Sequence, residues 1–117
     1  MVEGLAEMAQ RLSVGPGLDD PGHDLGPLVS RAQMEKVLGF IEGGRSAGAE
    51  AALGGARMDR PGWFVPPTIL TGVTDAMEIA REEAFGPLLA VQVFDEEAEA
   101  LDRANATAYG LAAGLWT

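Results

Sequence analysis

The feature that most constrains the fold of this chain is a strand, helix, strand pattern close to its end. Residues 88–94, LLAVQVF, form a continuous apolar run that is typical of a strand buried on both faces. Asp95 can cap a helix that we expect to run to about Asn105, with acidic residues in its first turn. The expected inner face of this helix consists of Ala98, Leu101 and Ala104. Residues 111–117 predict a second strand, so the pattern indicates a βαβ unit with two parallel neighbouring strands.

Two more helices are predicted earlier in the chain. The first is indicated by apolar residues at spacings of three and four, namely Met1, Leu5, Met8 and Leu12. The second is expected to begin at Ser30, which forms a capping box with Gln33, and to run to about Gly48. Its expected buried stripe consists of Met34, Val37, Leu38 and Ile41.

The middle of the chain predicts short extended segments. Residues 51–53 favour a short strand, and residues 75–80 favour a single helical turn. WFVPPTIL is β-branched and aromatic, but Pro66 and Pro67 cannot donate hydrogen bonds, so we expect an edge strand or an extended arm. Together these elements predict an α/β fold, a partial doubly wound parallel sheet with flanking helices. Residues 1–117 are expected to be one domain that is incomplete at both ends, because both ends fall inside elements.

Composition excludes several kinds of site. The chain has no cysteine and one histidine, His23, which rules out a cysteine nucleophile and a histidine pair for zinc, and we expect no metal site. A formal net charge of −10 repels phosphate and anionic lipid, so we expect neither nucleic acid nor membrane as a partner. No basic leader opens the chain, and no apolar run approaches the ~20 residues of a membrane span, so we expect a cytoplasmic protein.

Two glycine-rich stretches do not match known ligand loops. GGRSAG lacks the spacing and the lysine of a phosphate-binding loop, and no GxGxxG pattern occurs. Residues 14–27 are rich in Gly, Pro and Asp but lack the spacing of a calcium-binding EF-hand. Both stretches therefore predict solvated turns.

The stretch REEAFGP, residues 81–87, sets two carboxylates and a lone aromatic ring before a Gly-Pro turn. It is one of four blocks, with DLGPLVSRAQMEKV, GWFVPPTIL and ANATAYGLAAGLWT, that occur in order along nearly the whole chain. In these blocks the chain resembles the aldehyde dehydrogenase superfamily, whose members are NAD(P)-dependent. The resemblance covers only the C-terminal part of the catalytic domain.

This resemblance implies a cofactor-binding role for two residues. Glu83 matches the carboxylate that accepts hydrogen bonds from the two hydroxyls of the nicotinamide ribose of NAD or NADP, and an ionised carboxylate offers two suitable acceptor oxygens. Phe85 matches the ring that packs near the nicotinamide. Read without the family, Glu82 and Glu83 are solvated carboxylates and Phe85 is a core residue that fixes a turn. Glu82 keeps that interpretation, and Phe85 can serve both purposes.

The other matched residues are expected to be architectural. Asn105 is expected at a helix end and Tyr109 at the start of a strand. Trp63 and Trp116 are expected to pack rather than to line a substrate site.

The family's reaction, the oxidation of an aldehyde to a carboxylic acid, uses a cysteine thiolate that this chain lacks. No residue is therefore predicted to be catalytic, and the chain is expected to be a segment that is inactive by itself and self-associates into an oligomer. A non-catalytic interaction module that kept the fold is the alternative. The resemblance implies that the choice between NAD and NADP, and most of the selectivity for the aldehyde, are set outside these residues.

Overall fold

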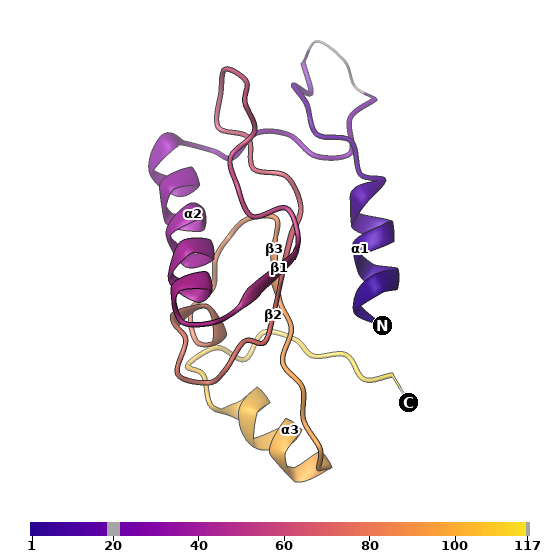
Figure 1. Cartoon of the computed structure of the whole chain (residues 1–117), viewed down its shortest axis with the longest axis vertical. Coiled ribbons are helices and arrows are strands. Elements are labelled where there is room, and N and C mark those ends of the chain that lie inside the picture. The colour runs from indigo at the N-terminus through magenta and orange to yellow at the C-terminus, as the bar shows by residue number, and fades with distance from the viewer. Residues whose placement is uncertain (19–21, 117) are drawn as a thin grey trace.

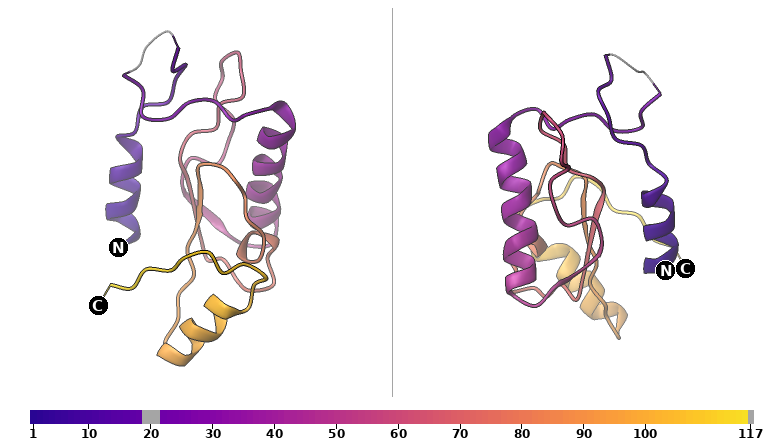
Figure 2. Two further views of the ribbon diagram at one scale, coloured as in Figure 1. Left: turned by 180° about the vertical axis from the view of Figure 1, so that it is seen from behind. Right: turned by 45° about the horizontal axis from the view of Figure 1, so that its top comes forward.

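A computed structural model describes residues 1–18 and 22–116 as a small α/β structure with a mixed sheet between two helices (Figure 1). Helices α1 and α2 lie on opposite sides of the sheet in both Figures 1 and 2. The elements in order are α1 (Val2–Gln10), α2 (Arg31–Ser46), β1 (Glu50–Leu53), β2 (Thr68–Thr71), the 3₁₀ helix η1 (Glu78–Ala80), β3 (Leu88–Ala90) and α3 (Glu97–Asn105).

The sheet has the strand order β1-β2-β3. β2 pairs with β1 in antiparallel fashion and with β3 in parallel fashion, so the sheet is mixed rather than parallel throughout. The expectation that WFVPPTIL is an edge strand or an arm is wrong, because β2 is the central strand. Pro66 and Pro67 precede the strand, and Thr68, the first residue after them, already donates its backbone N–H to the Pro87 carbonyl at 2.8 Å.

The core lies between α2 and the sheet. The expected stripe is confirmed at Met34, Val37 and Ile41, which are buried, whereas Leu38 is half-buried and Phe40 joins the core. On the sheet, Leu70 of β2 faces α2 and is fully buried, whereas the neighbouring Ile69, also buried, points to the opposite face and lines the groove beside α1. The glycine at position 44 lets α2 approach β2, because a Cβ added there would lie 3.1 Å from Leu70 Cδ1.

The predicted parallel pair over residues 88–94 and 111–117 does not form. β3 ends at Ala90, Val93 and Phe94 are exposed, and residues 111–116 form no strand, while Thr117 lies outside the described residues. The only described parallel partner of β3 is β2, so its other edge has no neighbouring strand within the described chain. An apolar run becomes a buried strand only when both faces and both edges find partners, and here they do not.

Helix α3 also differs from the expectation. It begins at Glu97 with Glu96 at the N-cap position, and Asp95 does not cap it. Its expected inner face is not buried, and no residue of α3 is buried. The helix is therefore attached to the molecule by something other than an apolar face.

Helix α1 carries the expected apolar face, but this face looks into an open groove. The groove has a volume of about 490 Å³ and separates Leu5, Met8 and Leu12 from Leu88 and Leu89 of β3. Beyond α1, the described residues of the loop expected at 14–27 contain no helix and only an isolated bridge between Val14 and Leu25. Residues 19–21 of that loop lie outside the described ones. No helix among the described residues has the length and apolarity needed to cross a membrane.

Candidate functional site

The REEAFGP stretch is the turn that joins η1 to β3. Its backbone is unusual at Phe85, the one non-glycine residue with positive φ among the described residues, at 48°. This left-handed conformation is unfavourable for a side chain as large as phenylalanine. Phe85 is 68% exposed, so the alternative interpretation, that it is a core residue fixing the turn, is wrong. A strained backbone that presents an exposed ring is typical of a site where the surrounding structure imposes the geometry.

Gln33, on the first turn of α2, holds this turn in place. Its side-chain Nε2 donates hydrogen bonds to the carbonyls of Ala84 at 2.7 Å and Phe85 at 3.1 Å. Half of the predicted capping box is confirmed, since Ser30 Oγ accepts from the Gln33 backbone N–H at 3.1 Å. The other half is wrong, because the Gln33 side chain reaches across to the turn instead of back to Ser30.

Gly86 brings the turn against α2. A Cβ at this position would lie 2.6 Å from Val37 Cγ2, so a larger residue would push the turn away from the helix. Two further hydrogen bonds continue the turn into β3, from Leu88 N–H to the Gly86 carbonyl at 2.7 Å and from Thr68 N–H to the Pro87 carbonyl. The turn is thus tied to α2 on one side and to β2 on the other.

A hollow with a volume of about 380 Å³ lies beside the two carboxylates. Among the residues that line it are Arg81, Glu82, Glu83, Thr107, Tyr109 and Leu111. The Tyr109 hydroxyl donates to Glu82 Oε2 at 3.1 Å. Within the described residues, no group donates a hydrogen bond to the Glu83 carboxylate, which is exposed. One carboxylate is therefore used by the protein and the other is available to a ligand.

The two predicted site residues therefore lie on the same turn but in different surroundings. Glu83 lines the hollow, whereas Phe85 is exposed on the turn and is not among the residues that line it. Glu82 is not merely solvated, and Tyr109, expected to be architectural, faces it. Gln33 was missed as part of this site, because a glutamine three residues after a serine is explained locally by capping. Among the described residues, no group of three His, Asp or Glu side chains gathers as metal ligands would.

Known proteins share the sequence and the fold of this chain. A model of the aldehyde dehydrogenase family matches residues 1–117. The chain belongs to the aldehyde dehydrogenase family. The betaine aldehyde dehydrogenase of Cereibacter sphaeroides is 52% identical over 113 residues, which cover 97% of this chain and 23% of that protein. This aldehyde dehydrogenase chain therefore spans about a quarter of the length of the curated relatives it matches.

Solved structures agree with this assignment. The NAD+ complex of an aldehyde dehydrogenase from Bacillus cereus superposes with a TM-score of 0.92 at 47% identity, over 99% of this chain and 23% of that one. An aldehyde dehydrogenase from Mycobacterium tuberculosis, also solved with NAD+, superposes with a TM-score of 0.87 at 39% identity, over 94% of this chain and 23% of that one. The α/β fold is accordingly that of part of the catalytic domain of this family, and both of these relatives were solved with NAD+.

Proposed function

We propose that this chain is a segment of an NAD(P)-dependent aldehyde dehydrogenase that oxidises an aldehyde to a carboxylic acid. In the proposed role, Glu83 accepts hydrogen bonds from the two hydroxyls of the nicotinamide ribose, and Phe85 packs near the nicotinamide. Family membership and the NAD+ complexes of two neighbours support the reaction class. The observation that carries the site assignment is the exposed Glu83 carboxylate at the edge of a hollow, free of donors within the described residues.

The residues present fit the ribose chemically. A vicinal diol presents two O–H donors, and an ionised carboxylate that accepts no other hydrogen bond has both oxygens free for them. The exposed Phe85 ring, two residues further along, offers an apolar face close to the same turn. When bound, NAD(P) supplies the acceptor for the hydride that leaves the substrate. The part of this chain is to hold and orient the nicotinamide end of that cofactor.

This chain by itself is proposed to be inactive and to bind NAD only weakly. It contains no cysteine, so it cannot supply the thiolate that the family's reaction uses. Contacts to one ribose are worth roughly 1.5–3 kcal/mol per charged hydrogen bond before the cost of ordering the ligand, so we expect a dissociation constant in the millimolar range or weaker.

A cytoplasmic location is proposed for the protein, as is self-association. A non-catalytic interaction module is the second candidate, and the exposed apolar residues at the end of the chain favour it.

The test uses a full-length host, the Cereibacter sphaeroides betaine aldehyde dehydrogenase in which residues 1–117 of this chain replace the segment they match. Glu83→Gln is expected to slow the hydride step, measured in single-turnover experiments, by about tenfold or more, because the neutral amide holds the diol less firmly. Glu78→Gln is the matched control, since it removes an exposed carboxylate from η1 on the same segment.

An unchanged rate of hydride transfer in Glu83→Gln would show that the assignment of Glu83 to the ribose site is wrong. For the isolated chain, NADH formation is assayed with several aldehydes. Measurable turnover by the pure chain would contradict the proposed inactivity.

A further inference from the structure

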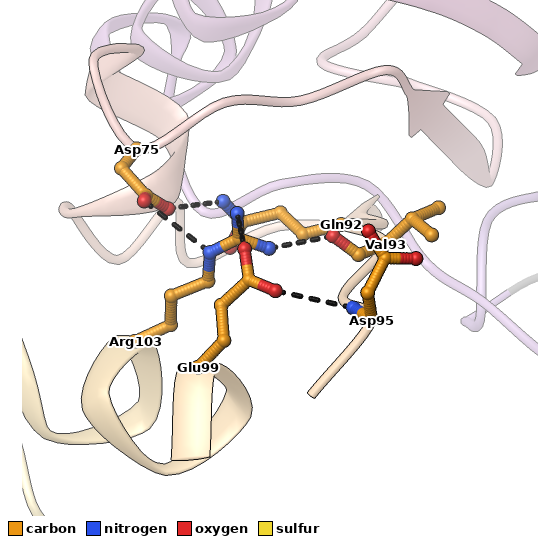
Figure 3. Close-up of polar contacts among 6 residues, drawn as sticks. All are labelled: Asp75, Gln92, Val93, Asp95, Glu99 and Arg103. Carbon is orange, nitrogen blue, oxygen red and sulfur yellow. Dashed lines mark hydrogen bonds and ion pairs between the residues drawn. The ribbon is translucent and has the colours of Figure 1, made fainter. Parts of the chain in front are cut away.

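Helix α3 is held to the molecule by a cluster of polar contacts centred on Arg103 (Figure 3). The Arg103 guanidinium uses three of its nitrogens on three different partners. Nε contacts Asp75 Oδ2 at 3.3 Å, Nη1 donates to the Val93 carbonyl at 2.6 Å, and Nη2 contacts Glu99 Oε1 at 2.6 Å. The planar fork of arginine suits such a junction, because its N–H groups point in fixed directions.

Asp75 receives the other half of this cluster. Its Oδ1 accepts a hydrogen bond from Gln92 Nε2 at 2.7 Å, while Oδ2 faces Arg103. The Glu99 carboxylate also reaches back to the Asp95 backbone N–H at 3.1 Å. Three segments therefore meet here: the turn before η1, the chain that follows β3, and α3 itself. We call these contacts the Arg103 clasp.

The two chain segments that leave the Arg103 clasp meet again at the hollow. From Asp75 the chain runs through η1 to Glu82 and Glu83, and from Arg103 it runs through the end of α3 to Tyr109. Tyr109 and Glu82 then join across the gap at 3.1 Å. A small cavity of about 60 Å³ lies between the segments and is lined by Asp75, Arg103 and Thr107, among others. The two segments are thus joined at both ends, by the Arg103 clasp and by the Tyr109–Glu82 hydrogen bond, and together they form one side of the hollow.

We propose that Tyr109 and Arg103 are positioning residues for the cofactor site. Tyr109 holds Glu82, so that the neighbouring Glu83 is the carboxylate left free to face the ribose. Arg103 fixes the end of α3 and thereby the place of Tyr109. The inference rests on the proposed function of Glu83 and goes beyond it, since neither residue is expected to touch the cofactor through the groups described.

Glu83 is then fixed from both sides along the chain. On one side Tyr109 holds Glu82, and on the other Gln33 holds the carbonyls of Ala84 and Phe85. The first contact holds the Glu82 side chain and the second holds the backbone just after Glu83, so together they are expected to limit how far the Glu83 carboxylate turns away from the hollow. Pre-ordering of this kind lowers the entropy lost when a ligand binds.

The affinity test uses the full-length host described above and two ligands. NAD+ carries the nicotinamide ribose, whereas ADP carries only the adenosine half, which the proposal places elsewhere. Tyr109→Phe keeps the ring and removes the hydroxyl, and Arg103→Ala removes the clasp. Each is expected to raise the dissociation constant of NAD+ by about two- to tenfold, the range for one hydrogen bond, with that of ADP unchanged. If these residues served stability alone, the variants would weaken the binding of both ligands or of neither.

The outcomes separate this proposal from the proposed function. If Glu83→Gln raises the dissociation constant of NAD+ but Tyr109→Phe and Arg103→Ala leave it unchanged, the positioning proposal is wrong and the site assignment stands. If Glu83→Gln has no effect on NAD+, both fall together.

A second measurement uses the chain itself, which has a single tyrosine, at a concentration at which light scattering finds it monomeric. Nuclear Overhauser contacts between the Tyr109 ring and the Glu82 side chain are expected in the unmodified chain. They should disappear in Arg103→Ala and persist in Arg45→Ala, which removes an exposed arginine from the last turn of α2. Persistence of these contacts in Arg103→Ala would overturn the role of the clasp even if the full-length variants fail to fold.

Discussion

At the scale of single residues, the left-handed backbone of Phe85 shows how this turn departs from local preference. A glycine would adopt a φ of 48° without strain, yet the chain has a phenylalanine there and a glycine at the next position. Gly86 is needed for close approach to Val37, whereas Phe85 exposes its ring. The turn therefore combines a tight fit to α2 with an aromatic surface that packing does not require.

The clamp from Gln33 offers a direct test at this scale. Gln33→Glu keeps the shape of the side chain but replaces the donor with an acceptor-only carboxylate facing two carbonyls. We expect the free energy of unfolding to fall by about 1–3 kcal/mol, measured by urea denaturation. Glu35→Gln, an exposed change on the same helix, should leave it within about 0.5 kcal/mol. Equal stability of the two variants would argue against the clamp.

The hydrogen bonds of Asp24 in the first loop lead us to expect that stability depends on pH. The backbone N–H of Ser13, at 2.8 Å, and its hydroxyl, at 2.9 Å, both donate to Asp24 Oδ2 and lower the pKa of this carboxyl below 3.8. Because the pKa is lower in the folded state, this contact adds to the free energy of unfolding above pH 3.8, the ordinary pKa of the carboxyl. That contribution is lost as the pH falls through the lowered pKa of the folded state. Carbon-detected NMR titration should show the low pKa. It should move up in Ser13→Ala and stay in place in Ser46→Ala.

At the scale of elements, the sequence predicts those parts whose signal is complete within a short window. α2 has a cap, a periodic apolar stripe and a nearby partner, and it forms as expected apart from Leu38 and Phe40. The short strand β1 and the turn at η1 also form where expected. Glu83 is singled out as a site residue only by the family resemblance, because nothing in the composition of REEAFGP distinguishes a ligand site from a solvated turn.

The errors share a physical cause, which is that a pattern does not reveal which partners are available. The apolar run 88–94 predicts a strand buried on both faces, yet its burial depends on neighbours that the run itself does not specify. The pattern around Pro66 and Pro67 predicts a strand that includes them, whereas β2 begins after them. Gln33 and Tyr109 reach partners 51 and 27 residues away, respectively, and such distances leave no local signature.

Two adjacent glycines in α2 allow a paired prediction. A Cβ at Gly43 meets nothing within 4 Å, whereas one at Gly44 lies 3.1 Å from Leu70 Cδ1. Gly43→Ala should raise the free energy of unfolding by about 0.5–1 kcal/mol, because alanine favours helix. Gly44→Val should lower it by about 1–3 kcal/mol through overpacking against β2. Thermal unfolding of both variants checks this, and the same sign for both would contradict the packing described.

At the scale of the whole molecule, the apolar surface is unevenly distributed. Leu115 and Trp116 are 87% and 91% exposed, so the expectation that Trp116 packs is wrong in this structure. Trp63, by contrast, is half-buried and packs against the core. The Arg31 guanidinium carbon lies over its ring, 4.9 Å from the ring centroid. The exposed residues near the end of the chain, the open edge of β3 and the groove beside α1 are each apolar surfaces of a kind that stable monomers seldom leave uncovered.

This surface leads to a prediction about assembly. We expect the isolated chain to self-associate at high micromolar concentration, because an apolar segment and an unpaired strand edge favour strand addition. Multi-angle light scattering is the measurement. Replacing Leu115 and Trp116 with aspartate should shift the mass toward the monomer, whereas the matched change of the surface pair Glu96 and Glu97 to glutamine should not. A clean monomer of the unmodified chain would contradict the prediction.

The polar attachment of α3 has a consequence for motion. With no buried side chain, this helix contributes little to the core, so it can separate from the sheet without disturbing α2 or β2. Segments of that kind open on their own, at a small fraction of the free energy of global unfolding. Its amide hydrogens should therefore exchange with solvent well before those of α2, and faster in concentrated salt, which screens ion pairs. The wall that carries Tyr109 is thus expected to open locally from time to time, and its positioning effect on Glu82 lasts only while the Arg103 clasp is closed.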